Sequence, residues 1–325
     1  MLKWLNVAFA ARALLSDTTC LTLTARQTEP GSPTSARLRQ LLTVPISPFT
    51  FALVAFVQER SSALNCAEKL RRVGGAFSYI LFNSRYAMKI ALTDIRISHK
   101  CERALKIRGF HVIKMPPMPT LPAPMASHPD MLLTYIDGTI LTSAEYCDSA
   151  AYLFCEIREL LPHIQIRFCD TAQGSEYPFD AAYNALSVGK KLFCRTKTVA
   201  PQILEFAKEH SFEIINVNQG YPACTTLALG ESHAISADDG MCRALFENGI
   251  SVSRIENGGI LLPPYEYGFI GGACGVYKDS AYFLGNLDLH PSANIIKNTC
   301  RMANITPISL SDEPLSDLGR IIFLD

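Results

Sequence analysis

The chain lacks an excess of charge of either sign and lacks a membrane-length hydrophobic run. Its 30 basic and 30 acidic residues cancel, and no block of like charge is long enough to attract nucleic acid or an anionic membrane. A membrane-spanning helix needs about 20 apolar residues, whereas the longest apolar stretch here runs only from Phe49 to Val57. These absences argue against nucleic-acid and membrane partners and favour a small-molecule ligand, while the oligomeric state is left open.

Cysteine motifs are also missing, although cysteine itself is not. Eleven cysteines occur at irregular spacings, without a C-x-x-C pair or a His/Cys cluster. Paired spacings of that kind are the signature of zinc sites, and disulfide frameworks belong to oxidising compartments. The sequence therefore predicts a cytoplasmic protein with no metal ion and no other cofactor.

Composition divides the chain near residue 88. Residues 1–87 carry ten Lys/Arg and four Asp/Glu, whereas residues 88–325 carry 20 and 26. The first part shows no repeated helical or strand pattern, and we interpret it as a poorly ordered or non-native N-terminal extension, with an ordinary N-terminal arm as the alternative. Regular patterns begin at Met88, where a strand, a helix capped by Ser98 and a stop at Gly109 follow one another.

Two distant segments of the second part share one pattern, in which a helix end, a glycine and a strand follow in order. Residues 103–114 (RALKIRGFHVIK) and 243–254 (RALFENGISVSR) match in Arg, Ala, Leu, Gly, Val and the closing basic residue. Weaker copies of this join begin at Leu161, His210 and Ala303. Self-similarity of this kind is typical of repeat architectures, so the sequence predicts five copies of one unit.

Four of the five joins follow a predicted hairpin, and the first follows a single strand. The hairpins cover residues 131–141, 181–194, 225–236 and 273–284, and the single strand is Lys89 to Thr93. The strand that the first unit lacks is Arg320 to Leu324, at the other end of the chain. The sequence therefore predicts an α/β propeller of five ββαβ blades, closed by pairing of the C-terminal strand with the strand at 89–93.

An open α/β sheet is the alternative architecture. A doubly wound sheet has single strands alternating with helices and a glycine-rich phosphate loop after the first strand. Here hairpins alternate with helices and no such loop follows residues 89–93, which favours the propeller.

Four segments carry a resemblance to a known fold family. They are residues 128–130 (HPD), 219–224 (QGYPAC), 264–275 (PYEYGFIGGACG) and 309–319 (SLSDEPLSDLG). With five ββαβ units, residues 88–325 resemble an uncharacterised bacterial family of the guanidino-modifying-enzyme (GME), or pentein, fold. In such enzymes a cysteine thiolate attacks the guanidinium carbon, a histidine moves protons, and carboxylates hold the flat cation.

The resemblance implies a site where the inner strands begin. The catalytic candidates are Cys224, His128, Asp130 and Cys274, and the substrate-binding candidates are Asp180, Tyr265, Glu266, Tyr267, Asp312 and Glu313, with Asp317 beside the last two. The set contains every group type that the chemistry needs. Its order differs from that of the known enzymes, because the histidine shares a segment with an acid and two cysteines compete for the role of nucleophile.

Each candidate also has a purely structural interpretation. Either cysteine can be a small buried hydrophobe, and His128 with Asp130 can be a hydrogen-bonded pair that closes a loop. Residues 256–272 form a long loop rich in glycine, proline and aromatic residues, which either closes over a ligand or packs as a surface loop. Asp238 is expected to cap a helix.

Two functions follow from these candidates. The first is a cysteine-dependent hydrolase or amidinotransferase acting on a small guanidino or amidino compound. The second is a non-catalytic propeller that binds a metabolite or a protein partner. The segments identify a fold family but no reaction, so the sequence leaves both open.

Overall fold

One pattern of strand pairing recurs five times in the computed structural model, which describes residues 20–23, 42–45 and 88–325. The chain falls into two units, Met1–Arg85 and Tyr86–Asp325. In the first, β1 (Cys20–Leu23) pairs antiparallel with β2 (Leu42–Pro45). The predicted character of residues 1–87 otherwise falls outside the described residues and stays a prediction.

Each blade of the second unit has an inner, a middle and an outer strand. The inner strand is antiparallel to the middle one, and the middle strand is parallel to the outer one. In this order, blade 1 contains β19 (Ile322–Leu324), β3 (Lys89–Asp94) and β4 (Phe110–Met115), and blade 2 contains β5 (Leu133–Ile136), β6 (Thr139–Ser143) and β7 (Gln165–Cys169). Blade 3 contains β8 (Leu186–Val188), β9 (Lys191–Cys194) and β10 (Glu213–Asn216), and blade 4 contains β11 (Thr226–Leu229), β12 (His233–Ser236) and β13 (Ser251–Arg254). Blade 5 contains β15 (Cys274–Tyr277), β16 (Ser280–Phe283) and β17 (Thr306–Ser309).

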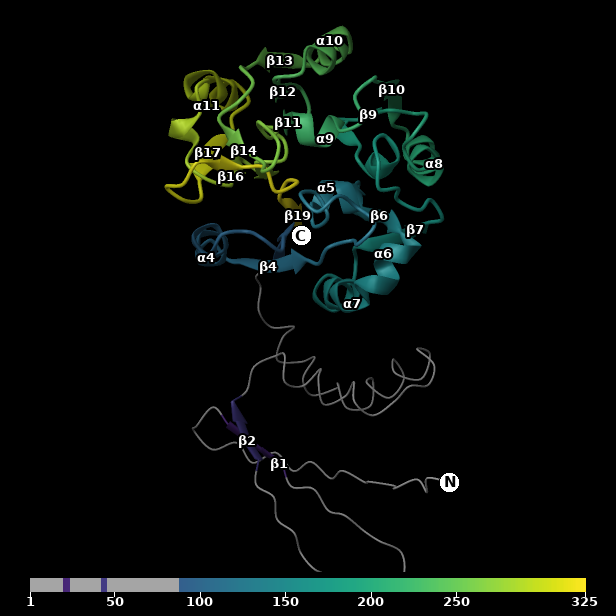
Figure 1. Ribbon diagram of the computed structural model, residues 1–325, viewed down its shortest axis with the longest axis vertical. Coiled ribbons are helices and arrows are strands. Elements are labelled where there is room, and N and C mark those ends of the chain that lie inside the picture. Colours follow the sequence, from purple (N-terminus) through teal and green to yellow (C-terminus); the bar gives the residue numbers. More distant parts are fainter. Residues whose placement is uncertain (1–19, 24–41, 46–87) are drawn as a thin grey trace, which may run out of the picture. The chain divides into compact units, whose positions relative to one another are not determined.

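Helices connect the middle strand to the outer strand of every blade and lie on the outside of the ring (Figure 1). They are α4 (His99–Ile107), α6 (Ala144–Ser149) with α7 (Ala151–Leu160), α8 (Pro201–Glu209), α10 (Asp239–Glu247) and α11 (Ala293–Met302). Ser98 caps α4 and Asp238 caps α10, because each side chain accepts a hydrogen bond from a backbone N–H of the first turn. Both caps were predicted from the sequence.

The ring closes between the two ends of the second unit. Ile322, Phe323 and Leu324 of β19 pair with Leu92, Ala91 and Ile90 of β3. All three β19 side chains are buried. This pairing and the five ββαβ blades confirm the predicted propeller of the pentein fold, and the open sheet is excluded.

Hairpin turns occupy one end of the ring. Asp137 and Gly138, Gly189, Gly230 and Lys278 all have the positive φ that tight hairpin turns require. These are the four turns that the sequence located.

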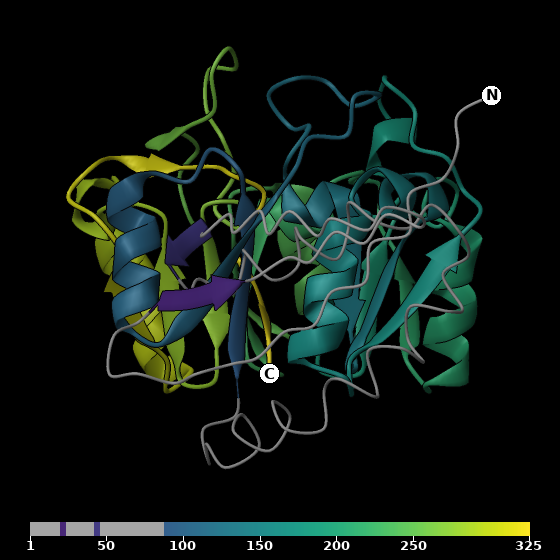
Figure 2. The same cartoon turned by 90° about the horizontal axis from the view of Figure 1, so that it is seen from below.

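Elements outside the repeat cluster at the other end. They are α5 (Pro129–Leu132), α9 (Pro222–Thr225), the 3₁₀ turns η1 (Phe179–Ala181) and η2 (Leu287–Leu289), and a parallel pair formed by β14 (Ile260–Leu261) and β18 (Leu315–Ser316). Figure 2 shows long loops of several blades rising from this end and the C-terminus at the opposite end. Within the described ranges, no helix has the length and apolar character that crossing a bilayer requires.

Candidate functional site

Five short segments, here called the lead-in segments, run into the five inner strands. They are residues 317–320, 128–132, 180–184, 221–225 and 270–274. Hydrogen bonds join each to the next around the ring: Asp130 N to Gly319 O (3.1 Å), Asn184 Nδ2 to Asp130 O (3.1 Å), Ala223 N to Asn184 Oδ1 (2.8 Å), Gly272 N to Cys224 O (3.0 Å) and Leu318 N to Gly272 O (3.1 Å). The circle gathers polar groups from all five blades at one place.

Glycine and proline make this convergence sterically possible. Pro129 and Pro222 begin α5 and α9, where a missing N–H costs nothing. A Cβ on Gly272 would lie 1.9 Å from Asp317 Oδ1, and one on Gly319 would lie 2.1 Å from His128 Cβ. Only glycine fits at these two contacts, so the backbone itself forms part of the wall of the site.

Cys224 lies on the lead-in segment at 221–225, between an acid and an amide. Its thiol donates to Asp130 Oδ2 at 2.9 Å and accepts from Asn184 Nδ2 at 3.1 Å. Asn184 Oδ1 accepts from Ala223 N, which fixes the orientation of the amide. Burial, followed by the nearby charge of Asp130, raises the pKa of the Cys224 thiol well above its usual value. The thiol is therefore protonated at neutral pH, with a carboxylate in place to accept its proton.

Asp130 and Asp317 are two buried acids whose charges act on each other. Burial raises the pKa of Asp130 to about 6, against the opposing effects of the Cys224 hydrogen bond and the Arg320 charge. Burial and the Asp130 charge raise the pKa of Asp317 to about 7. Asp317 accepts hydrogen bonds from the backbone N–H groups of Phe269 and Gly319. Asp130 Oδ1, in contrast, has no hydrogen-bond partner among the described residues.

His128 faces two acids but hydrogen-bonds neither. Its Nε2 lies 3.8 Å from Asp94 Oδ2 and its Nδ1 lies 3.9 Å from Asp317 Oδ1. Burial lowers the pKa of His128 to about 4, so the ring is neutral at pH 7. Nε2 has no partner among the described residues.

Asp94 is a site residue that the sequence reasoning missed. It is the last residue of the middle strand β3, is fully buried, and binds Arg96 through both carboxylate oxygens, at 2.9 Å (Nε to Oδ1) and 2.6 Å (Nη2 to Oδ2). The resemblance places its candidates where inner strands begin, whereas Asp94 ends a middle strand. The available signal was an aspartate that ends a buried strand, followed two residues later by arginine.

Asp180 and Gln173 add two more buried acceptors. Tyr221 donates its hydroxyl hydrogen to Asp180 Oδ2 at 2.6 Å, while Asp180 Oδ1 has no partner among the described residues. The Gln173 amide nitrogen donates to the backbone oxygens of Met131 and Asp180. Its Oε1 has no hydrogen-bond partner in the part of the chain that the structure describes. Gln173 was not singled out from the sequence, because a lone glutamine in a loop carries no spacing signal.

The remaining candidates do not join this cluster. The Cys274 thiol donates to Ile270 O at 3.0 Å and packs in a hydrophobic core with Phe283 and Cys300. Asp312 and Glu313 are exposed and pair with Lys100. Tyr265 and Glu266 are exposed, and Tyr267 is half-buried.

The chemical groups of the cluster are covered. Cys224 is only 5 % exposed and Asp130 only 3 %. Tyr221 and Phe269, both half-buried, pack against the core that contains Cys224. Phe269 belongs to the loop at 256–272 and its N–H donates to Asp317, so part of this loop contacts the cluster, whereas Tyr265 is exposed.

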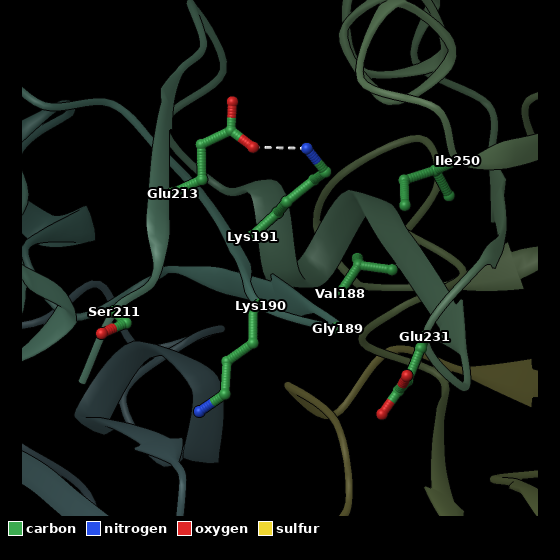
Figure 3. A pocket seen from close by; sticks show the side chains of 8 residues that line it. All are labelled: Val188, Gly189, Lys190, Lys191, Ser211, Glu213, Glu231 and Ile250. Carbon is green, nitrogen blue, oxygen red and sulfur yellow. Dashed lines mark hydrogen bonds and ion pairs between the residues drawn. The ribbon is translucent and has the colours of Figure 1, made fainter.

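A separate surface depression of about 470 Å³ lies at the end of the ring that carries the hairpin turns (Figure 3). Its lining includes Gly189, Lys190, Lys191, Glu213 and Glu231. Lys191 pairs with Glu213 across it, and none of the clustered acids lines it. Among the described residues, no group of three or more His, Cys, Asp or Glu is arranged to hold a metal ion.

Comparison with known proteins gives one family and distant structural likenesses. The model of a family of unknown function, DUF6873, matches residues 92–322. No curated protein sequence matches the chain. An amidinotransferase from Microseira wollei, of the saxitoxin biosynthetic pathway, has 12% sequence identity and a TM-score of 0.41, with 67% of this chain and 73% of that chain covered. The inosamine-phosphate amidinotransferase of Streptomyces griseus has 12% identity and a TM-score of 0.42, with 69% and 78% covered.

Proposed function

We propose that the Cys224 cluster of this chain, which belongs to the family of unknown function DUF6873, binds a small guanidino or amidino cation. The cluster then modifies this cation through the cysteine. The observation that carries the proposal is the thiol of Cys224 held between Asp130 and Asn184. A nucleophile in hydrogen-bond contact with a base is the arrangement that covalent catalysis requires.

Unpaired buried oxygens support a cation as the ligand. Asp130 Oδ1, Asp180 Oδ1 and Gln173 Oε1 are acceptors without donors among the described residues. A buried acceptor without a partner costs about 1 to 3 kcal/mol. A flat cation rich in N–H groups supplies the missing donors, and its charge compensates the buried carboxylates.

The proposed reaction begins with proton transfer from the thiol to Asp130. The bound cation favours the thiolate because its positive charge opposes the burial that holds the thiol pKa high. The thiolate sulfur then forms a bond to the amidino carbon. The bond from this carbon to the leaving nitrogen breaks, and the leaving amine takes up the proton that Asp130 accepted. Attack by water or by an amine then breaks the carbon–sulfur bond, and the thiolate regains a proton from the attacking group. Attack by water gives a hydrolase, and attack by an amine gives a transferase.

The test is incubation of the protein, under reducing conditions, with a panel of alkylguanidines, guanidino acids and amidines. We expect release of ammonia or amine, and an amidino adduct on Cys224 in mass spectra of the denatured protein. Cys224→Ala should abolish both signals. Cys274→Ala is the matched control, because that thiol bonds to a backbone carbonyl in the outer core. Turnover that survives Cys224→Ala would refute the proposal.

A binding function without chemistry is the second candidate, and the burial of Cys224, which raises the pKa of its thiol, favours it. A buried, protonated thiol behaves as a small apolar side chain. In that case a guanidino compound should raise the melting temperature of the protein without forming product, and Cys224→Ala should leave this stabilisation unchanged.

A further inference from the structure

Asn184 is a buried amide whose two ends are assigned by the backbone groups that they meet. Its Oδ1 accepts from Ala223 N at 2.8 Å, and its Nδ2 donates to Asp130 O at 3.1 Å. A backbone N–H can only donate and a backbone carbonyl can only accept, so the opposite orientation of the amide would break both hydrogen bonds. The amide nitrogen therefore lies toward Asp130, whatever the protonation of the neighbouring side chains.

The second hydrogen on this nitrogen is left for the sulfur of Cys224. Nδ2 lies 3.1 Å from Cys224 Sγ, whereas its other contact with sulfur, Met131 Sδ, is longer at 3.7 Å. Asn184 is only 1 % exposed, so solvent has little access to this hydrogen. The thiol of Cys224 thus has Asp130 on one side, at 2.9 Å, and an N–H donor on the other.

An N–H donor favours the charged form of a thiol, and the other groups near Cys224 oppose that form. Burial, followed by the charges of Asp130 and Asp317, raises the pKa of the thiol, and the hydrogen bond from Asn184 lowers it. Tyr221, another titratable side chain whose charge is coupled to this thiol, donates its hydroxyl hydrogen to a different acid. Once Asp130 has accepted the thiol proton, the Asn184 N–H meets a negative sulfur in a charge-assisted hydrogen bond.

The second cysteine of the lead-in segments lacks such a donor. Cys274 Sγ donates to Ile270 O at 3.0 Å and lies 4.0 Å from Gly271 O, and among the described residues no side chain donates a hydrogen bond to it. A thiol that faces carbonyl oxygens keeps its proton. Asn184 is therefore one feature that separates the two cysteines, although they come from equivalent segments of the repeat.

We propose that Asn184 is the hydrogen-bond donor that stabilises the Cys224 thiolate, and that its amide holds this sulfur in register with the segment of Asp130. The inference rests on the proposed function, because a thiolate is needed only where Cys224 acts as a nucleophile. The stabilisation itself can be measured without a substrate.

Alkylation of Cys224 by iodoacetamide provides the first test, because the thiolate is the form that attacks the reagent. The rate for each cysteine is followed by mass spectrometry of the digested protein, from about pH 6 to about pH 9. Asn184→Asp keeps an oxygen for Ala223 N but removes both N–H groups, so it should slow alkylation of Cys224 about tenfold or more at each pH. Cys155, which is exposed, is the internal reference in every digest.

The direction of the change separates stabilisation of the thiolate from packing. A substitution that only loosens the site exposes the thiol and speeds its alkylation. Asn286→Asp is the matched control, because Asn286 Oδ1 also accepts from a backbone N–H, that of Asp288 at 3.0 Å, and should leave the Cys224 rate unchanged. A folded Asn184→Asp protein whose Cys224 reacts as fast as in the unaltered protein, or faster, would overturn the proposal.

A second measurement keeps Asn184 in place and does not depend on the folding of its variant. The two hydrogens of the Asn184 amide nitrogen give separate signals in nitrogen-15 NMR spectra. Cys224→Ala removes one acceptor, so one signal should move upfield while the signal of the hydrogen bonded to Asp130 O stays in place. If neither signal moves, the sulfur accepts no hydrogen bond from Asn184 and the proposal is wrong.

Failure of the function proposed for Cys224 would look different. The panel of guanidino compounds and amidines would then give no product and no adduct. The slower alkylation of Asn184→Asp and the NMR shift in Cys224→Ala would both remain.

Discussion

The two ends of the ring are built from the same five blades but differ in what they bury. At the end of the lead-in segments, Asp130 and Asp317 are buried with raised pKa values, and polar atoms lack partners within the described part of the chain. At the end of the hairpin turns, Asp137 is exposed and pairs with Lys190 and His210, and its pKa is lowered. One repeat thus gives a buried polar end and a solvated end, and the buried polar end is the candidate site.

Loss of β19 and the end of its lead-in segment is expected to have the largest effect on stability. Deletion of residues 319–325 removes the buried side chains of Ile321, Ile322, Phe323 and Leu324 and exposes the edge of β3. Full burial of such a side chain contributes about 1.5 to 3 kcal/mol, and a domain has only about 5 to 15 kcal/mol in all. The truncated protein should aggregate, which size-exclusion chromatography and circular dichroism would show.

A matched change at the other end should have little effect. Insertion of two glycines after Gly230 lengthens an exposed hairpin turn, and loop closure costs rise slowly with length. The insertion should keep a cooperative thermal transition. A soluble, cooperatively folded truncation would show that closure by β19 is not required for stability.

Single glycine substitutions compare the two ends at the scale of one methyl group. Gly272→Ala places a Cβ 1.9 Å from Asp317 Oδ1, and should cost about 3 kcal/mol because the buried Asp317 carboxylate, which accepts hydrogen bonds from Phe269 N and Gly319 N, must shift. Gly138→Ala meets nothing within 4 Å, so only its φ of +73° opposes the change, at about 1 kcal/mol. Urea denaturation of the two variants measures both costs. Equal losses would mean that the lead-in segments are no more tightly packed than the turns.

The pH dependence of stability should have opposite signs at the two ends. The folded pKa of Asp130, about 6, is above the unfolded value, so the native state holds its proton more tightly and stability falls as pH rises from about 4 to about 6. Asp130→Asn removes this fall. From pH 4 to pH 7, the free energy of unfolding of the variant should therefore gain up to about 3 kcal/mol relative to the unaltered protein.

Asp137→Asn supplies the control for that titration. The folded pKa of Asp137 is lowered, chiefly by its hydrogen bond to His210, so its contribution is present at neutral pH and is lost as pH falls through the folded pKa. The substitution should reduce stability at pH 7 and have no effect in acid. Parallel pH profiles for the two variants would contradict the assignment of a buried acid with a raised pKa at position 130.

The smallest effect is expected for Lys190→Ala. This exposed lysine pairs with Asp137 and lines the open depression of Figure 3. Exposed ion pairs contribute about 0 to 1 kcal/mol, and salt screens them. The free energies of unfolding of the variant and the unaltered protein, taken from thermal melts, should differ by no more than about 0.5 kcal/mol. The difference should be smaller at high salt. A larger loss would show that the turn end carries more of the stability than its exposure implies.

The sequence predicted the ring well because its information is local and repeated. The four turns, the caps at Ser98 and Asp238 and the strand missing from the first blade can all be read from short segments, and the repeat then fixes their order. The pair of β14 with β18 was not predicted, because two-residue strands carry no periodic signal.

The candidate site was predicted in part. The resemblance, carried over by position within the repeat, implied Cys224, His128, Asp130 and Asp180 as candidates on lead-in segments, and the structure brings them together. The same reasoning selected Cys274, whose segment is equivalent by repeat but whose thiol points into the outer core. Position within a repeat gives the segment but not the direction of the side chain.

What the sequence by itself determined is therefore the number of blades, their order and the closure of the ring, because hairpins, caps and glycine stops act over a few residues. Only the tertiary structure decided which of the equivalent groups meet. Asp94 joins His128, and Asn184 joins Cys224, through contacts between different blades. The pKa values of Asp130 and Asp317 likewise depend on burial, which arises only when all five blades are assembled.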